Sequence, residues 1–182
     1  MMAQTLNALH THLNGSKESL AKEASAGNQA GRQDERIGHV GLHVTNPAAS
    51  GEFYRDGFGM EMVGGSTPDH PVGATAFLSS RPHEEAHEIA LFANPEFAHI
   101  AFKVSSLAEL RSFQARVVEK NIPIKFTLNN GVSFAFYFDD PDGHMLEVYW
   151  PTGDLSHRQP FAEPLDLSQP DEALLGKLTA TI

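Results

Sequence analysis

Hydrophobic and polar residues alternate along several short runs in the middle of the chain, as expected for strands that bury one face. The run 39–44 reads His-Val-Gly-Leu-His-Val, and the run 99–104 reads His-Ile-Ala-Phe-Lys-Val. The two runs match position by position, so each predicts a strand whose first histidine lies on the face opposite the apolar packing residues. The run 145–150, Met-Leu-Glu-Val-Tyr-Trp, shows the same alternation and predicts a third strand, with Glu147 on the face away from its apolar side.

Each of the two matching runs begins a unit with the same predicted order of elements, β-α-β-β-β. In the first unit, Asn46 and Pro47 are typical of a helix start, because asparagine caps free backbone N–H groups and proline suits the first helical turn. In the second unit, Ser106 and Glu109 form a capping-box pattern, and the helix is expected to stop before Pro123. The remaining strands are expected near 60–63, 74–79 and 88–92 in the first unit, and near 124–128, 133–138 and 145–150 in the second.

The duplication predicts an α+β fold in which two paired βαβββ modules form a curved mixed sheet of eight strands around a cavity, with the helices outside. We expect this domain to span 36–150, with modules at about 36–93 and 97–150. Residues 1–35 are expected to be a short helix followed by a linker, since they hold few large apolar residues. The tail, 151–182, contains four prolines and is expected to be mostly extended, with a short terminal helix that packs on the domain or across a dimer interface.

Composition excludes several classes of partner. The chain has 182 residues and a formal charge of −10, from 13 Lys and Arg against 23 Asp and Glu. A nucleic-acid backbone or an anionic membrane surface requires clustered cations, so neither is expected as a partner. Without cysteine, the chain can form neither disulfides nor thiolate metal sites. No apolar run is long enough to span a bilayer, and the N-terminus lacks the features of a secretory signal, so a cytoplasmic location is expected by default.

His39, His99 and Glu147 are the candidate metal ligands. Two histidines and one carboxylate are the minimum set for a facial metal site with open coordination positions, which suits non-heme Fe(II) oxygenases. A single histidine in a strand is more often a surface or hydrogen-bonded residue. Here, however, two histidines occupy the same position of duplicated strands, and a glutamate interrupts an otherwise apolar strand. This coincidence favours a metal site built by the three side chains.

With these motifs the chain resembles the vicinal oxygen chelate superfamily, whose members include extradiol dioxygenases, glyoxalase I and fosfomycin-resistance thiol transferases. The resemblance covers residues 37–150. It rests on the two histidine runs, on Phe53 and Tyr54 in the first predicted helix, and on the run 138–147, Phe-Asp-Asp-Pro-Asp-Gly-His-Met-Leu-Glu. Several branches of the superfamily keep the same His, His, Glu set, so these motifs indicate the superfamily more strongly than the reaction.

Two further features resemble the extradiol ring-cleaving branch, in particular single-domain proteins like catechol 2,3-dioxygenase. The run 77–80, Phe-Leu-Ser-Ser, is followed by 85–91, Glu-Ala-His-Glu-Ile-Ala-Leu, and Tyr137 lies ten residues before Glu147. The resemblance implies that His87 is an acid/base beside bound oxygen and that Tyr137 hydrogen-bonds the substrate. It also implies an Fe(II) cofactor, with Mn(II) as the other candidate, and a small catechol-like aromatic diol and O₂ as substrates. We further expect a homo-oligomer.

One segment departs from the pattern of this branch. Some extradiol enzymes carry a second histidine a little before the tyrosine, where this chain reads Thr-Leu-Asn-Asn at 127–130. Asn129 or Asn130 could replace only a hydrogen bond of that histidine, so both are candidate substrate-binding residues. His43 is a third candidate, because strand alternation places it on the same face as His39, although a structural role suits it equally.

Three alternatives remain open on the same scaffold. Glyoxalase I resembles the chain but uses a fourth ligand, a glutamate on the last strand of the first module. His87 and Glu88 are adjacent, so on a regular strand only one of them faces the metal. His87 would suit a three-ligand site and O₂ activation, whereas Glu88 would suit a redox-inert ion and isomerase chemistry. A thiol transferase keeps three ligands but requires cations around a phosphonate, for which Lys103 is the candidate. The third alternative, a binding protein without chemistry, generally lacks the metal ligands.

Overall fold

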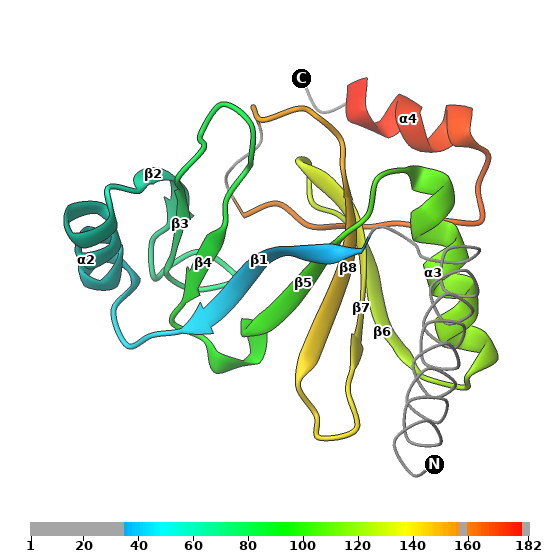
Figure 1. Ribbon diagram of the computed structural model, residues 1–182, viewed down its shortest axis with the longest axis horizontal. Helices are drawn as coiled ribbons and strands as arrows, with labels where there is room; N and C mark the ends of the chain where they lie inside the picture. The colour runs from blue at the N-terminus through cyan, green and yellow to red at the C-terminus, as the bar shows by residue number, and fades with distance from the viewer. Residues whose placement is uncertain (1–34, 157–159, 180–182) are drawn as a thin grey trace, which may run out of the picture. The chain divides into compact units, whose positions relative to one another are not determined.

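The computed structural model describes residues 35–156 and 160–179 (Figure 1). The helix and linker predicted for residues 1–35 therefore lie, apart from residue 35, outside the described residues. The described part confirms the predicted α+β fold: one curved sheet of nine strands carries three α-helices and a short 3-10 helix. None of the helices in this part of the chain is both long and apolar enough to cross a membrane.

The elements follow the order β-α-β-β-β twice, as the sequence predicts. The first module contains β1 (Arg36–His43), α2 (Pro47–Phe58), β2 (Glu61–Ser66), β3 (Thr75–Ser79) and β4 (Ile89–Phe92). A 3-10 helix, η1 (Pro95–Phe97), leads into the second module, which contains β5 (His99–Lys103), α3 (Leu107–Glu119), β6 (Ile124–Asn129), β7 (Ser133–Asp139) and β8 (Met145–Pro151). The tail adds β9 (Glu163–Pro164) and α4 (Asp171–Thr179).

Both predicted helix starts are confirmed. The Asn46 side chain accepts a 3.1 Å hydrogen bond from the backbone of Ala49, and Pro47 occupies the first turn of α2. At the start of α3, the Ser106 hydroxyl accepts a 3.1 Å hydrogen bond from the Glu109 backbone. These caps satisfy N–H groups that have no partner within the helix. Each helix therefore begins at its cap, a few residues after the strand that carries a candidate metal ligand.

The two modules join edge to edge in one sheet. The strand order is β2-β3-β4-β1-β5-β8-β7-β6-β9, with β1 and β5 antiparallel at the seam. β1 pairs in parallel with β4, and β5 pairs in parallel with β8, so each half repeats the same arrangement on its own side of the seam. Val40 lies opposite Ile100 in the register, which places an approximate twofold axis at this pair. His39 is therefore the structural counterpart of His99.

The ninth strand is a difference from the eight that the repeat predicts. β9 pairs with β6, and Leu165, which follows it, donates a backbone hydrogen bond of 2.9 Å to the Thr127 carbonyl. Two residues are too few to give a periodic pattern, and Pro164 argues against a strand when only the sequence is known. Proline is tolerated here because β9 is an edge strand of the described sheet.

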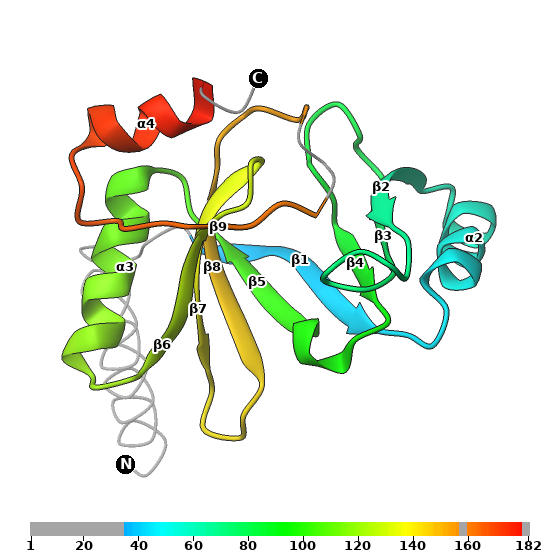
Figure 2. The same cartoon turned by 180° about the vertical axis from the view of Figure 1, so that it is seen from behind.

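Helix α2 covers the first half of the sheet, and α3 and α4 cover the second half (Figures 1 and 2). One core cluster contains Leu110 of α3, Phe136 of β7 and Leu174 of α4. Arg111 of α3 also forms an ion pair with Asp171 of α4. Of the two positions expected for the terminal helix, the structure therefore shows packing on the domain.

Candidate metal centre

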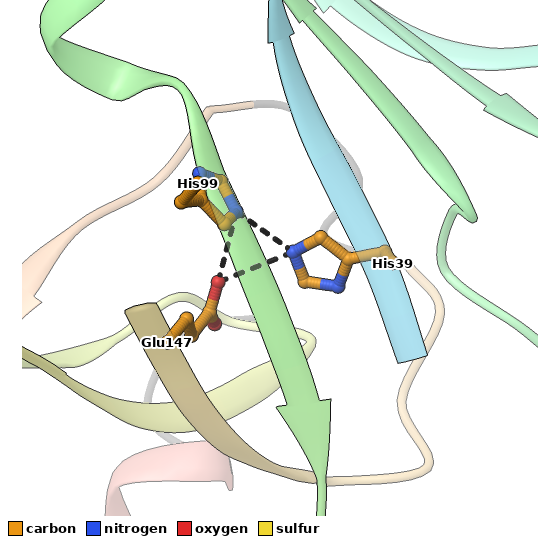
Figure 3. Close-up of side chains that lie close together, drawn as sticks. All are labelled: His39, His99 and Glu147. Atoms are coloured by element: carbon orange, nitrogen blue, oxygen red, sulfur yellow. Dashed lines mark hydrogen bonds and ion pairs between the residues drawn. The ribbon is translucent and has the colours of Figure 1, made fainter. Parts of the chain in front are cut away.

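Three neighbouring strands bring His39, His99 and Glu147 together. β5 lies between β1 and β8 in the sheet, and Ala101 of β5 lies opposite both His39 and Glu147 in the two registers. His99 comes from the same strand, two residues before Ala101, and so shares its face. Figure 3 shows the three side chains pointing toward one another, each from its own strand.

The three side chains meet at nearly equal distances. His39 Nε2 lies 3.0 Å from His99 Nε2, and each of these nitrogens lies 3.1 Å from Glu147 Oε2. The side chains of His39, His99 and Glu147 are only 6%, 7% and 2% exposed. Among the described residues, this is the one group of three His, Asp or Glu side chains whose ligand atoms converge so closely.

The spacing of these atoms fits a metal ion. With metal–ligand bonds of about 2.1 Å, neighbouring ligands of an octahedron lie about 3.0 Å apart, whereas ligands of a tetrahedron lie about 3.4 Å apart. The separations of 3.0 and 3.1 Å are short enough for one ion to contact all three ligand atoms. Three protein ligands on one face of an octahedron leave three positions for other molecules. The donor set could therefore hold a divalent first-row metal in an open site.

Contacts with the backbone set the direction of the His99 ring. Its Nδ1 lies 2.7 Å from the Phe97 carbonyl oxygen. When Nδ1 donates this hydrogen bond, Nε2 keeps its lone pair for a metal. The opposite position on β1 is Gly41, where an added Cβ would lie 2.5 Å from His99 Nδ1. A glycine is therefore required beside this candidate ligand, because any side chain would displace the ring.

The ionisation of the three groups is coupled. Burial acts to raise the pKa of Glu147, but the charges of His39 and His99 and their hydrogen bonds hold that pKa far below its ordinary value of 4.5. Burial acts to lower the pKa of His99, but Glu147 and the Phe97 carbonyl raise that pKa above 6.5. Glu147 is thus anionic near neutral pH, and a metal must compete with a proton on His99.

A cavity of about 550 Å³ adjoins the three side chains. His87, Tyr137 and Asn130 form polar parts of its wall, and aromatic and aliphatic side chains form most of the rest. Tyr137 lies opposite Glu147 in the β7–β8 register, and its hydroxyl accepts a 2.9 Å hydrogen bond from Asn130 Nδ2. Burial and the charge of Glu147 raise the pKa of Tyr137 well above 10, so the phenol stays protonated and can donate a hydrogen bond.

His87 and Glu88 have different surroundings. The His87 ring stacks on Phe77, with ring centroids 5.0 Å apart, and its centroid lies 4.4 Å from that of His39. His87 therefore lines the cavity beside the candidate ligands. The Glu88 carboxylate instead accepts a 2.9 Å hydrogen bond from Arg81 Nε and further hydrogen bonds from two neighbouring serines. Of the two adjacent residues, the structure places His87 in the cavity wall.

Other candidates from the sequence lie away from the cavity wall. His43 is exposed at the end of β1. Asn129 is 1% exposed and accepts a 2.8 Å backbone hydrogen bond, whereas Asn130, on the other side of the alternation, lines the cavity. Lys103 Nζ lies 2.7 and 2.9 Å from the two carboxylate oxygens of Glu85. Of the three residues predicted to bind substrate, the structure thus brings only Asn130 to the cavity.

Several side chains around the site were not predicted from the sequence. The β2–β3 loop contributes Val72 to the cavity wall, and the tail contributes Phe161. The Tyr149 ring lies 5.0 Å from the His39 ring. Strand alternation could have found Tyr149, since it shares the face of Glu147, but no periodic pattern marks the loop or the tail.

The fold and the site together define a class of protein, in which paired βαβββ modules build a cavity beside a candidate site of two histidines and one carboxylate. The Glyoxalase/Bleomycin resistance protein/Dioxygenase superfamily matches residues 36–148, and the chain belongs to this family. The resemblance to the vicinal oxygen chelate superfamily is thereby confirmed.

Relatives within the family differ in their reactions. The chain is 29% identical over 125 residues to biphenyl-2,3-diol 1,2-dioxygenase 3 of Rhodococcus globerulus, with 62% of each chain covered. It is 32% identical over 129 residues to metallothiol transferase FosB of Shouchella clausii (strain KSM-K16), with 67% of this chain and 83% of that protein covered.

A solved structure shares the fold. The crystal structure of 2,2',3-trihydroxybiphenyl 1,2-dioxygenase from dibenzofuran-degrading Sphingomonas wittichii strain RW1 matches with a TM-score of 0.55 and 22% identity, covering 74% of this chain and 50% of that one. The chain thus spans 62% and 50% of the lengths of the two dioxygenases, which is less than two thirds. Their activities therefore do not transfer directly to this chain.

Proposed function

We propose that the protein is an extradiol dioxygenase, which cleaves the ring of a catechol-like aromatic diol and adds both atoms of O₂ to the product. His39, His99 and Glu147 would hold Fe(II), or Mn(II), which would supply binding positions for the diol and O₂ and electron density for the reaction. The observation that carries the proposal is the position of His87. This potential acid/base lines an aromatic cavity directly beside a three-ligand site.

The strand register supports three protein ligands rather than four. Ala101 pairs with Glu147, and the corresponding pair in the first module is Gly41 with Ala90. The position equivalent to the carboxylate ligand therefore carries a methyl group. Glu88, the other candidate for a fourth ligand, is engaged by Arg81 and two serines. An isomerase site of the glyoxalase I type needs the fourth ligand, so this arrangement favours the dioxygenase.

His87 and Tyr137 supply the proton transfer and the hydrogen bond that the reaction requires. An imidazole can both accept and donate a proton, so His87 can take a proton from a diol hydroxyl or return one to a reacting oxygen. Tyr137 remains a neutral phenol because burial and Glu147 raise its pKa. Its hydroxyl accepts a 2.9 Å hydrogen bond from Asn130 and hydrogen-bonds Glu147, and it can donate to a substrate oxygen when it turns away from Glu147.

Among the described residues, the cavity wall does not carry the cations that a thiol transferase requires. Lys103 is paired with both oxygens of Glu85, and the described cavity wall contains neither lysine nor arginine. A phosphonate would therefore be desolvated with few positive partners besides the metal. Because a metallothiol transferase is among the relatives, the two reactions are best compared on the same protein preparation.

The test is oxygen consumption by the metal-loaded protein. Protein reconstituted with Fe(II) without air, then mixed with O₂ and a catechol, should consume oxygen and form a yellow ring-opened product. Methylglyoxal with glutathione, and fosfomycin with a thiol, should give no turnover. Turnover of either of these substrates, together with no oxygen uptake on a broad catechol panel, would overturn the proposal.

Alanine variants test the ligand set directly. His39→Ala, His99→Ala and Glu147→Ala should each lose metal on desalting while keeping the fold, because the three groups hold the ion only as a set. His83→Ala and Glu119→Ala remove the same chemical groups from exposed positions and serve as matched controls. Bound iron or manganese is measured by atomic emission, and the fold by circular dichroism. Full metal occupancy in any one of the first three variants removes that residue from the ligand set.

A further inference from the structure

The described cavity wall carries no fixed positive charge. Its ionisable groups are histidines, Tyr137 and Glu147, and it contains neither lysine nor arginine. Lys103, which belongs to the same strand as His99, is already paired with Glu85 at 2.7 Å. Apart from a metal held by the candidate ligands, a substrate carboxylate that entered this cavity would find neither lysine nor arginine in the described wall to pair with it, which costs free energy.

Aromatic rings from both modules stand beside the candidate ligands. The centroid of the Phe92 ring lies 5.8 Å from that of His99, and the centroid of Tyr137 lies 6.1 Å from it. Phe77 continues the first wall, 6.3 Å from Phe92, and Phe126 continues the second, 4.6 Å from Tyr137. All four rings line the cavity. A flat aromatic ring can pack against such walls through stacked or edge contacts.

The cavity is larger than a single catechol ring requires. Its volume of about 550 Å³ lies within the range of roughly 300–1,000 Å³ for cavities that enclose drug-sized ligands. Val72 of the β2–β3 loop, Leu128 of β6 and Phe161 of the tail complete its wall. The pairing of β9 with β6 holds the tail at this side of the sheet. These additional side chains are apolar, so the extra space favours an apolar group that removes their surface from water.

From these observations we propose that the aromatic diol carries a large, uncharged, apolar substituent, about the size of a second ring, and that diols bearing a carboxylate are excluded. This inference rests on the proposed function, since it concerns the diol of the same site. The diol hydroxyls lie near His87 and Tyr137, and the substituent occupies the space lined by Val72, Leu128 and Phe161. The absence of a cation from the described wall selects against charge, and the apolar side chains select for size.

Binding can be measured without turnover. Mn(II)-loaded protein is titrated under nitrogen at one fixed pH with catechol, 4-phenylcatechol and 3,4-dihydroxybenzoate. We expect 4-phenylcatechol to bind roughly 10- to 100-fold more tightly than catechol, because its second ring is buried. We expect 3,4-dihydroxybenzoate to bind at least roughly 10-fold more weakly than catechol, because its carboxylate is unpaired. Equal or tighter binding of 3,4-dihydroxybenzoate, or equal binding of the two uncharged diols, would overturn the inference.

A matched pair of variants tests the missing charge. Val72→Arg introduces a cation at the cavity wall, and Val118→Arg introduces the same cation on the exposed side of α3. Val72→Arg should strengthen binding of 3,4-dihydroxybenzoate at least roughly 10-fold and weaken binding of 4-phenylcatechol, whereas Val118→Arg should change neither. Unchanged selectivity in Val72→Arg would show that the charge of the wall does not set the preference.

Oxygen uptake with the same diols separates this inference from the proposed function. If 4-phenylcatechol binds most tightly but no diol supports oxygen uptake, the substituent preference stands and the dioxygenase proposal fails. If 3,4-dihydroxybenzoate binds best and is turned over, the dioxygenase proposal stands and the substituent preference fails. Failure of every diol to bind would overturn both.

Discussion

Replacing Gly41 by alanine should damage the metal site without changing a ligand. A Cβ added at Gly41 would lie 2.5 Å from Nδ1 and 2.6 Å from Cε1 of His99. Ordinary contacts begin at 3.4 Å, so the ring would have to move from 2.5 to 3.4 Å, which is a shift of about 0.9 Å. Metal–ligand distances tolerate only about 0.2 Å. The required displacement is several times larger than a bound metal allows.

The surroundings of the His99 ring oppose an easier adjustment. Phe92 Cε2 would lie 3.1 Å from the same added Cβ, and His99 Nδ1 is held by the Phe97 carbonyl at 2.7 Å. A shift of the ring breaks this hydrogen bond and moves Nε2 out of its position beside Glu147. Loss of such support alone costs about 10- to 100-fold in metal affinity, so we expect a loss of at least about 100-fold. Overpacking should also destabilise the metal-free fold by about 1–3 kcal/mol.

Gly57→Ala is the matched control for this prediction. Gly57 belongs to α2, and an added Cβ there meets nothing within 4 Å. This variant should bind metal like the unmodified protein and gain up to about 1 kcal/mol of stability, because alanine favours a helix. Metal affinity is measured by competition with a chromophoric chelator, and stability by thermal unfolding. If the two variants bind metal equally well, the ring of His99 does not occupy the ligand position described here.

Three further changes probe the remaining roles. His87→Ala should lower catechol turnover about 10²- to 10⁴-fold at unchanged metal content, as expected for a positioned acid/base. Glu88→Ala should change neither turnover nor metal content. Metal loss in Glu88→Ala with activity kept in His87→Ala would favour a four-ligand isomerase site. Tyr137→Phe removes one hydrogen-bond donor and should lower kcat/KM about 10-fold, and unchanged steady-state kinetics would exclude substrate contact. Below the raised pKa of His99, metal affinity should rise by up to about 10-fold per pH unit, because a proton must leave His99 before the metal binds. Metal affinity is measured by chelator competition, and an affinity that does not change with pH would argue against His99 as a ligand. In the metal-free protein, protonated His99 contributes stability that is fully present below pH 6.5 and is lost as the pH rises through its raised pKa, so the unfolding temperature should fall there.

The fold could be predicted because its signals are local or repeated. Strand alternation in 39–44 and 99–104 predicts the strands that carry His39 and His99, and the match between the runs indicates the duplication. Asn46 and Ser106 start their helices through hydrogen bonds to residues three positions away, so the pattern is contained in a few neighbouring residues. Glu147 stands out because a carboxylate in an apolar strand needs a partner.

The surroundings of the site were harder to predict, because they depend on contacts between distant segments. His87 and Glu88 come just before β4, and the hydrogen bond from Arg81 holds Glu88 away from the candidate ligands. Lys103 shares a strand with His99, but its charge is paired by Glu85, eighteen positions earlier in the chain. No pattern within one strand reports such pairings.

Strand alternation predicts which side chains share a face, but it does not predict where along the strand the cavity ends. His43 has the same strand parity as His39, yet it is exposed beyond the cavity wall. Asn129 and Asn130 are adjacent at the end of β6, and the pleat turns Asn129 to the packed side and Asn130 to the cavity. How far the cavity reaches along a strand, and which way side chains point at the strand end, depend on the neighbouring loops. A single sequence does not reveal the structure of these loops.

The duplication of the module explains where the candidate site lies. Positions at which the two modules carry different residues account for the chemical groups in that site. Glu147 pairs with Tyr137 across β8 and β7, and the equivalent pair across β4 and β3 is Ala90 with Phe77. Equivalent positions therefore carry a carboxylate and a phenol in one half, and a methyl and a phenyl group in the other. A second carboxylate in place of Ala90 would add a fourth ligand and another negative charge. The apolar pair instead leaves that side open and provides the ring on which His87 stacks at 5.0 Å. The proposed three-ligand site with an adjacent acid/base thus rests on different residues at equivalent positions of the two modules.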